Sequence, residues 1–405
     1  MRALAILVAR AAFIVSRLAG KDGTSLPGMW ATKVSPHILK IMAQDVRRGI
    51  ILITGTNGKT STTNLCQAYL EDAGYSVICN SGGANMYNGV VAAFLKQASL
   101  FKRCAFDYAV LEVDELYTPR IGKEIPIRTF VITNLFADQL DRCGSIDYVR
   151  DTLVSAIGHT PDDCLVVLNR DNRDSAIIAD TTSRKTVTFG IEHSADLHAT
   201  DVRQGEALSF RIDSPRDNID ATTNLRGLYN ISNILAATVA ATSEGITLEQ
   251  CADTLMRYQT QPGRMERFEV AYKHVTLTMA KNPAGFNRSL ESLSTGTDTD
   301  TYDVVIAVNN TIADGEDTAW YSQIDFENLD QESRFNYYLT GTQAPTMAKR
   351  LKQAGIIEKR VHTHPELDRA LQAGLDGEGD QLFILANYST VFPLRKRLIA
   401  RMNSE

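Results

Sequence analysis

The segment IILITGTNGKTSTTNLCQAYL, residues 50–70, decides the fold class. It begins with an aliphatic run that is typical of a buried strand, continues into a polar loop with two glycines, and ends in a stretch of helical length. This order of elements is suited to phosphate, because the loop and the first turn of the helix present backbone N–H groups to the oxygens. The segment therefore predicts a phosphate-binding unit in an α/β fold.

The loop departs from the usual phosphate loop at one position. The pattern G-x-x-x-x-G-K-[ST] requires glycine at position 53, where this chain has Ile53. Lys59 is expected to reach the β- and γ-phosphates, and the Thr60 hydroxyl is expected to bind Mg²⁺. A glycine turn without a ligand is the alternative, and the lysine, threonine and flanking elements together argue against it. The predicted loop residues are Gly55, Thr56, Asn57, Gly58, Lys59, Thr60 and Ser61.

The composition limits the classes of function. A chain of 405 residues, 44% hydrophobic, is too long for one compact core and suits two or three domains. Charged residues make up 22% and the net charge is −6, so no nucleic-acid surface is expected. The six cysteines form no C-x-x-C pair, which argues against a zinc ribbon or a redox dithiol and fits reduced thiols in a cytoplasmic protein.

Residues 1–48 are predicted to form an N-terminal helical segment. Arg10 and Arg17 interrupt its apolar runs, which are too short to span a bilayer. The spacing of an amphipathic helix is followed by Leu4, Leu7, Ala11, Phe13 and Ile14. We expect the helix to pack on the body of the protein, and contact with a membrane surface is the alternative.

Strand-like and helical segments alternate from residue 49 onward, which predicts a parallel sheet covered on both faces. Residues 196–214 alternate polar and apolar residues and predict a few antiparallel strands. Pro262 and Gly263 indicate a domain boundary. The expected organisation is a central ATP-binding domain over 49–260 and a smaller Rossmann-like α/β domain over 261–405.

Several motifs resemble the Mur ligases and their folate-ligase relatives, which form amide bonds with ATP. ITGTNGKTSTT, residues 53–63, is similar to their phosphate loop. Within that family the chain most resembles the MurT group, the ATP-using subunits that amidate the peptidoglycan precursor lipid II. The segments that carry this resemblance are GTSLPG (23–28), LEVDE (111–115), TNLFADQLDR (133–142), PGRMERF (262–268), AKNPAGFN (280–287) and ANYS (386–389).

Further site residues follow from position and from the resemblance. Glu112 ends a predicted strand at the carboxyl edge of a parallel sheet, and the resemblance makes it a Mg²⁺ ligand beside Thr60. Asn134, Asn169 and Asn230 resemble the nucleotide side of the family site, although buried asparagines that cap helices look the same. Arg264 matches the family arginine that acts on the γ-phosphate, and a surface salt bridge is its alternative.

Two departures from the ordinary Mur ligases favour the MurT group. Gln139 stands where most of them carry a metal-binding histidine, and Leu153 lies near the place of a lysine that many carry. The resemblance implies that MurT proteins share the glutamine. Most of these proteins also contain a four-cysteine zinc ribbon, which this sequence lacks, so no structural zinc is predicted.

The segment NNTIADGEDTAWYSQIDFENL, residues 309–329, resembles the MurT segment that serves a glutaminase partner. In the family an aspartate from this segment completes a Cys–His pair on the partner, as the third member of a triad does. Asp317 is the first candidate for this role and Asp314 the second. We expect Trp320 and Tyr321 to lie in an exposed loop on which the partner docks.

The resemblance implies peptidoglycan synthesis by ATP-dependent amidation. An acyl phosphate would form on the α-carboxyl of D-glutamate in the lipid II stem peptide, with Mg²⁺, Lys59 and Arg264 offsetting the repulsion between anions. The chain has no G-x-C-x-G motif of its own, so a GatD-like glutaminase in a heterodimer would supply ammonia. The expected location is the cytoplasm, with membrane contact only through the lipid-linked substrate. An amino-acid-adding ligase and a nucleotide-binding regulator are the alternatives.

Overall fold

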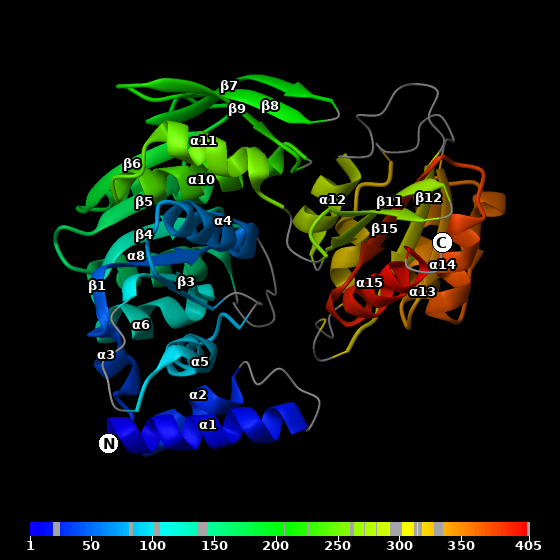
Figure 1. Ribbon diagram of the computed structural model, residues 1–405. Helices are drawn as coiled ribbons and strands as arrows, with labels where there is room; N and C mark the ends of the chain where they lie inside the picture. The colour runs from blue at the N-terminus through cyan, green and yellow to red at the C-terminus, as the bar shows by residue number, and fades with distance from the viewer. Residues whose placement is uncertain are drawn as a thin grey trace. The chain divides into compact units, whose positions relative to one another are not determined.

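A computed structural model describes residues 1–18, 25–80, 84–100, 106–136, 145–205, 207–225, 227–259, 263–270, 272–280, 282–291, 302–311, 314, 318–327 and 335–402. The chain divides into two compact units. The first comprises Met1–Asn224 and Tyr229–Tyr258, and the second comprises Leu225–Leu228 and Gln259–Glu405. Each unit is built around its own sheet (Figure 1).

The first unit contains a sheet of nine described strands in the order β2-β3-β1-β4-β5-β6-β7-β8-β9. The pairs from β2 to β7 are parallel, and β7, β8 and β9 pair antiparallel. This confirms the predicted parallel sheet and the antiparallel strands within 196–214. The strands are β1 (Val46–Thr54), β2 (Val77–Cys79), β3 (Phe106–Glu112), β4 (Ile127–Ile132), β5 (Leu165–Asn169), β6 (Lys185–Gly190), β7 (Leu197–Gln204), β8 (Leu208–Asp213) and β9 (Asn218–Thr223).

Helices cover both faces of this sheet, as parallel strands require. On one face α4 and α10 contact each other, and α6, α8 and α9 pack together elsewhere in the unit. The helices after the N-terminal segment are α4 (Lys59–Asp72), α5 (Tyr87–Gln97), η1 (Glu115–Tyr117), α6 (Thr118–Glu124), α8 (Ile146–Gly158), α9 (Arg173–Thr181), α10 (Tyr229–Ser243) and α11 (Leu248–Arg257).

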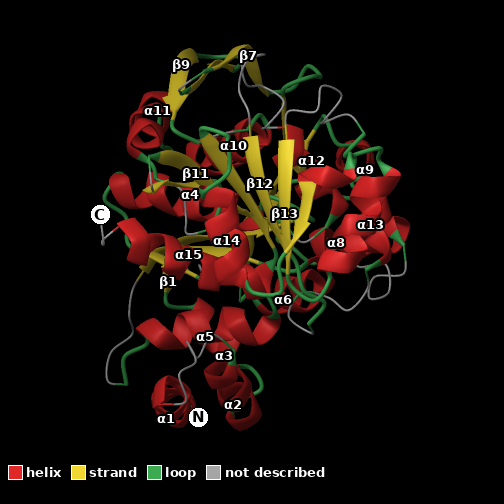
Figure 2. Ribbon diagram, turned by 90° about the vertical axis from the view of Figure 1, so that its right-hand side faces the viewer, coloured by secondary structure: helices red, strands yellow, loops and turns green. Residues whose placement is uncertain are grey.

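In the described part of the chain, three helices precede the sheet: α1 (Arg2–Leu18), α2 (Leu26–Val34) and α3 (Ile38–Ala43). They lie beside α5, and the view in Figure 2 shows the four helices together. The predicted packing face of α1 is wrong, because Leu4, Leu7 and Ile14 are exposed. Ala5, Ile6 and Ala9 enter the core instead. Among the described residues, no helix is both long and apolar enough to cross a membrane.

The second unit contains a sheet of six described strands in the order β10-β11-β15-β12-β13-β14. All pairs are parallel except β10 with β11. The strands are β10 (Glu266–Val270), β11 (Lys273–Met279), β12 (Tyr302–Ala307), β13 (Phe335–Thr340), β14 (Val361–Thr363) and β15 (Gln381–Ala386). The helices are α12 (Pro283–Glu291), η2 (Ala319–Gln323), α13 (Ala344–Gln353), η3 (Glu358–Arg360), α14 (Leu367–Leu375) and α15 (Tyr388–Met402).

The register of the central strands places several chain segments at one edge of the first sheet. Ile50–Ile53 are buried on both faces of β1, in keeping with their apolar character. Ile53 pairs with Glu112 of β3, and Thr54 pairs with Ile132 of β4. The carboxyl ends of β1, β3 and β4 therefore meet where ligands bind in open parallel sheets.

Candidate functional site

The loop between β1 and α4 has a conformation that requires its two glycines. Gly55 has φ +123° and Gly58 has φ +86°, values that L side chains rarely adopt. A Cβ atom on Gly55 would meet the Thr133 hydroxyl, and one on Gly58 would meet the Asn233 carboxamide, both far inside van der Waals distance. The positive φ angles and the close neighbouring atoms together explain why both positions are glycine.

Asn134, which follows β4, holds the loop in this shape. The Thr56 amide donates to the Asn134 carbonyl at 2.8 Å, and the Asn57 amide donates to Asn134 Oδ1 at 2.9 Å. Asn134 Nδ2 in turn donates to the Asn57 carbonyl at 3.0 Å. The Thr133 hydroxyl donates to the same carbonyl at 2.6 Å. The structure thus brings Asn134 to the loop as the sequence predicts, and these contacts are with the loop backbone.

Helix α4 begins directly at Lys59, with Gly58 as its N-cap residue. No side chain of the described part of the chain caps this end. The first N–H groups of a helix have no acceptor within the helix, and they coincide with the positive end of its dipole. Thr60 and Ser61 are partly exposed in the same turn. This terminus can therefore accept an anion of the size of a phosphate.

The Lys59 ammonium lies across the loop and is almost fully buried. Its Nζ donates to the carbonyls of Gly55 and Thr56, the latter at 3.2 Å, and lies 3.3 Å from Glu115 Oε1. Burial lowers the pKa of Lys59, but the carboxylates of Glu115, Glu112 and Asp114 outweigh burial, so the net pKa is raised above its ordinary value. Lys59 is a permanent positive charge within the site.

Glu112 ends β3 and is 2% exposed. Its backbone is fixed by Asn80, which accepts from the Glu112 amide at 2.8 Å and donates to the Glu112 carbonyl at 2.7 Å. The side-chain Nδ2 of Asn85 donates to Oε1 at 3.1 Å, whereas Oε2 is buried without a hydrogen-bond partner among the described residues. A buried carboxylate oxygen without a donor is costly, and a hard cation such as Mg²⁺ would satisfy it.

Asn169 and Asn230 form hydrogen bonds with residues outside the loop. Asn169 Nδ2 donates to the Thr133 carbonyl at 2.9 Å, and its Oδ1 accepts from the Asp171 amide at 2.9 Å. In α10, Asn233 donates to Asn230 Oδ1 at 3.2 Å. Asn233 is the residue that sequence reasoning missed. Its helical spacing of three from Asn230 is a signal that could have found it.

The region in which this chain departs from the ordinary Mur ligases is only partly described. Asp138 and Gln139 lie outside the described residues. Leu153 is fully buried in the core of the first unit, so this position presents an apolar side chain rather than a cation. Lys281, in the segment AKNPAGFN, and Asp317, the first candidate for the aspartate that serves the partner, also lie outside the described residues.

Asp314 in the second unit is bound on both carboxylate oxygens. The Ser389 amide, in the first turn of α15, donates to Oδ1 at 2.9 Å, and the Thr311 hydroxyl donates to Oδ2 at 2.6 Å. This carboxylate stabilises the start of α15. The expectation of an exposed aromatic loop is wrong for Tyr321, which is buried. Trp320 is half-buried, with its ring centre 4.3 Å from that of Tyr321 and 6.2 Å from that of Phe286.

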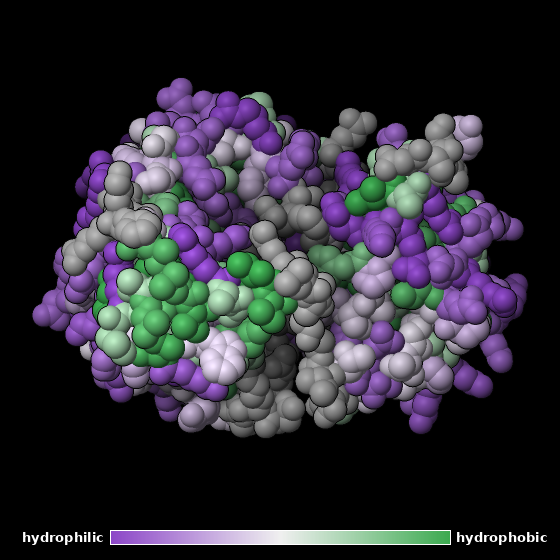
Figure 3. Space-filling view, turned by 60° about the horizontal axis from the view of Figure 1, so that its bottom comes forward, coloured by the Kyte–Doolittle hydropathy of each residue, from purple (hydrophilic) through white to green (hydrophobic). Residues whose placement is uncertain are grey.

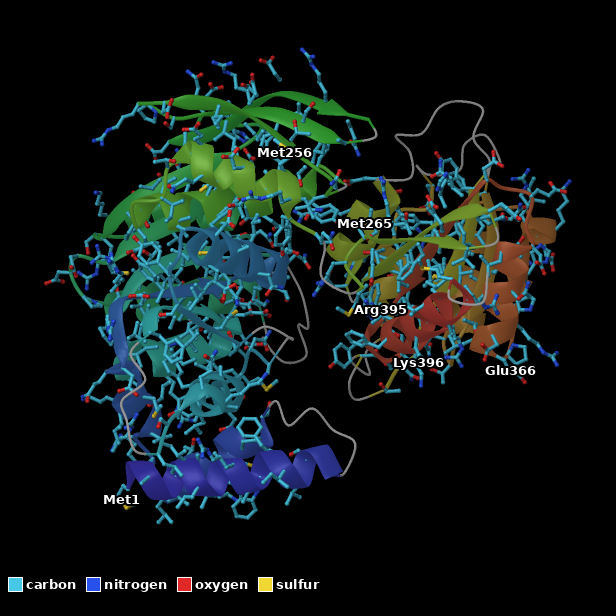
Figure 4. The ribbon with its side chains drawn as sticks, in the orientation of Figure 1. Met1, Met256, Met265, Glu366, Arg395 and Lys396 are labelled. Carbon is cyan, nitrogen blue, oxygen red and sulfur yellow. The ribbon has the colours of Figure 1, made fainter. Side chains whose placement is uncertain are left out.

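Arg264 belongs to the second unit and follows Gly263, which has φ +72°. The turn is anchored by Glu266, whose Oε2 accepts from the Gly263 amide at 2.8 Å. Arg395 of α15, labelled in Figure 4, donates from Nε to both oxygens of Glu266 at 3.0 and 2.9 Å. The backbone at Arg264 is therefore held firmly, and its role toward a phosphate stays a prediction.

Comparisons with known proteins match both units. Residues 53–241 match the family model of the Mur ligase middle domain, and residues 279–391 match that of the MurT ligase C-terminal domain. The chain is 30% identical to the lipid II isoglutaminyl synthase (glutamine-hydrolyzing) subunit MurT of Staphylococcus aureus strain COL, over 97% of each chain. It is 28% identical to the subunit of the same name from Streptococcus pneumoniae strain R6, over 98% of this chain and 97% of that one.

Solved structures show the same fold at lower identity. The MurF ligase from Thermotoga maritima in complex with ADP aligns with a TM-score of 0.74 at 16% identity, covering 93% of this chain and 84% of that one. At this identity the likeness establishes the Mur ligase fold and nothing about substrates. The fold class expected from the sequence is thereby confirmed.

Proposed function

The chain belongs to the family of MurT subunits, and we propose on this premise that it amidates a lipid II-type peptidoglycan precursor with ATP. The family is one of ATP-dependent ligases, and the relatives are named as subunits of lipid II isoglutaminyl synthase. One observation supports the proposal most strongly. Lys59, Glu112 and the N-terminus of α4, which no side chain of the described residues caps, lie together at the carboxyl edge of the first sheet. The carboxyl group to be amidated is the α-carboxyl of D-glutamate in the stem peptide.

The described residues suit ATP with Mg²⁺. The first turn of α4 would bind the phosphates through its N–H groups, with Lys59 adding a positive charge. Glu112 and the Thr60 hydroxyl would hold Mg²⁺, which when bound neutralises phosphate charge. The buried, unpartnered Oε2 of Glu112 fits that requirement. Arg264 would bring a further cation to the γ-phosphate, as the family resemblance implies. We propose no structural zinc.

The nitrogen source in this proposal is ammonia from a GatD-like glutaminase. The relatives carry "glutamine-hydrolyzing" in their names and are subunits, so a second subunit fits. Asp317 is the favoured residue toward that partner, because both oxygens of Asp314 already accept hydrogen bonds within the chain. Asp317→Asn should abolish amidation from glutamine and preserve amidation from ammonium. Equal loss from both sources would remove Asp317 from this role.

The second candidate, an amino-acid-adding ligase, is disfavoured by one observation. The position where many such enzymes carry a lysine is Leu153, which is buried in an apolar core. The two functions separate in an ADP-release assay with a lipid II-type muropeptide, ATP and Mg²⁺. Release that depends on ammonium and ignores added amino acids supports the proposal. Release that depends on an amino acid would replace it.

A further inference from the structure

Helix α1 packs on the body of the first unit through its smaller side chains. Ala5, Ile6, Ala9 and Ser16 are buried, and the first three belong to the core cluster that includes residues of α5. Arg2 adds an ion pair with Asp45 at 2.6 Å. Since the face made mostly of small residues is turned inward, the bulky apolar residues of the helix are left outside.

Those bulky residues and the exposed apolar residues of α2, which contacts α1, make up a surface that we call the α1–α2 face. It consists of Leu4 (52% exposed), Leu7 (51%), Ile14 (61%), Val15 (59%), Leu26 (39%) and Trp30 (45%). Figure 3 shows hydrophobic side chains gathered on this end of the first unit. Large exposed apolar patches on proteins mark binding surfaces, because each of these side chains would be more stable away from water.

The charge around the α1–α2 face is opposite in sign to that of the whole chain. Residues 1–44 hold six Lys and Arg residues and one Asp, although the chain has a net charge of −6. Arg10, Lys33 and Lys40 are exposed, and Lys33 Nζ lies 4.7 Å from the centre of the Trp30 ring. An amphipathic helix with basic residues at its border is typical of elements that lie in the surface of an anionic membrane.

We propose that the α1–α2 face docks on the surface of a bilayer that contains anionic lipid, with α1 parallel to the membrane plane. Arg10 stands in the middle of α1, so the helix is suited to lying on a membrane rather than crossing it. A second copy of the chain fits less well, because a symmetric contact would bring the same basic residues of both copies together.

The docking face is connected through α5 to Glu112, the carboxylate at the end of β3. Helices α2 and α5 contact so closely at Gly28 that a Cβ atom there would overlap the Asn88 carbonyl. Two residues before α5, Asn85 donates to the Glu112 carboxylate. The proposal goes beyond amidation and does not depend on it. Its consequence is that the protein itself, and not only a lipid-linked substrate, contacts the membrane.

The test is co-sedimentation of the full chain with vesicles of phosphatidylcholine alone and of phosphatidylcholine with roughly one third phosphatidylglycerol. We expect salt-sensitive binding to the anionic vesicles. The combined variant Leu4→Gln, Leu7→Gln and Ile14→Gln should weaken it about tenfold or more, and Lys33→Gln with Lys40→Gln should weaken it less. A matched control, Met256→Gln with Ile357→Gln, changes exposed apolar residues elsewhere and should bind like the wild type.

Three outcomes would overturn the proposal. The first is that the wild type does not sediment with anionic vesicles. The second is that the triple variant sediments with them as well as the wild type does. The third is that light scattering shows a wild-type dimer, absent in the triple variant, and neither protein binds vesicles. Thermal unfolding of each variant checks its fold. Amidation of a soluble muropeptide should be unchanged in the triple variant, so failure of the proposed reaction and failure of membrane docking are separate results.

Discussion

The side-chain amide of Asn85 donates to Oε1 of Glu112 at 3.1 Å, while Oε2 of the same carboxylate is buried without a hydrogen-bond partner among the described residues. One oxygen is thus oriented by the protein, and the other is kept available in a site where Lys59 supplies the nearby positive charge. An oriented carboxylate with one unsatisfied oxygen is the arrangement that a metal ion completes.

Glu112→Gln should lower the ADP-release rate by roughly 100-fold at a fixed Mg²⁺ concentration, because a carboxamide is a poor Mg²⁺ ligand. The substitution keeps the acceptor for Asn85 and removes a buried charge, so the thermal midpoint should stay equal or rise. Titration of ADP release with Mg²⁺ measures the effect. Glu192→Gln, at an exposed position, is the control. A Glu112→Gln variant with a normal Mg²⁺ response would show that Glu112 holds no metal.

Lys59 and Glu115 should have opposite effects on nucleotide binding. Lys59→Met removes the buried positive charge and should weaken ADP binding by roughly 100-fold. Glu115→Gln removes the carboxylate that lies 3.3 Å from Lys59 Nζ and competes with phosphate for it, so ADP without Mg²⁺ should bind a few times more tightly. Isothermal titration calorimetry distinguishes the two. Weaker binding in Glu115→Gln would mean that Glu115 supports the nucleotide rather than competing with it.

Gly58→Ala should destabilise the first unit more than Gly74→Ala does. The two glycines have nearly the same φ, +86° and +88°, but a Cβ on Gly58 meets Asn233, whereas nothing lies within 4 Å of one on Gly74. The shared positive φ costs about 1–2 kcal/mol. The overlap at Gly58 adds about 1–3 kcal/mol. Chemical denaturation of both variants, and of Gly58→Ala with Asn233→Ala, gives the comparison. Equal losses at the two glycines would show that Asn233 imposes no steric limit.

His364 should make stability depend on pH. Burial, followed by the positive charges of His362 and Arg369, lowers the pKa of His364 below 6.5, and its Nε2 is buried without a partner among the described residues. The unfolded chain therefore binds this proton more readily. The stabilising contribution is present above pH 6.5 and is lost as pH falls through the folded pKa.

The measurement for His364 is the thermal midpoint between neutral and mildly acidic pH. His364→Asn should reduce the fall in the midpoint on acidification, whereas His159→Gln, at an exposed position, should leave it unchanged. An unchanged fall in His364→Asn would assign the acid sensitivity to other groups.

The sequence predicted the first sheet well because its strands carry strong local signals. Ile50–Ile53 are β-branched or aliphatic throughout and are buried on both faces. The loop was equally predictable from the sequence. Gly55 and Gly58 occupy positions whose positive φ angles favour glycine, and Lys59 follows them directly. The position of Glu112 could be predicted because the carboxyl ends of parallel strands lie together at one edge of the sheet.

Other features depend on contacts that sequence spacing does not reveal. The periodicity of α1 identified an apolar stripe at Leu4, Leu7 and Ile14, but not which face would be buried, because small residues pack more closely than large ones. Trp320 and Tyr321 lie in a polar segment, yet Tyr321 is buried and the Trp320 ring packs between those of Tyr321 and Phe286. The spacing of Asn233 from Asn230 could have marked it as a polar residue on the same helix face, but not its contact with Gly58, which lies far away in the sequence.

The most direct test of the proposed amidation is mass spectrometry of a lipid II-type muropeptide incubated with the protein, ATP, Mg²⁺ and ammonium. Replacement of one hydroxyl by an amino group predicts a small mass decrease in the product, located by fragmentation at the D-glutamate α-carboxyl and formed far more slowly with Glu112→Gln. No mass change with ammonium, together with a gain of one residue mass when amino acids are supplied, would contradict amidation and establish an amino-acid-adding ligase.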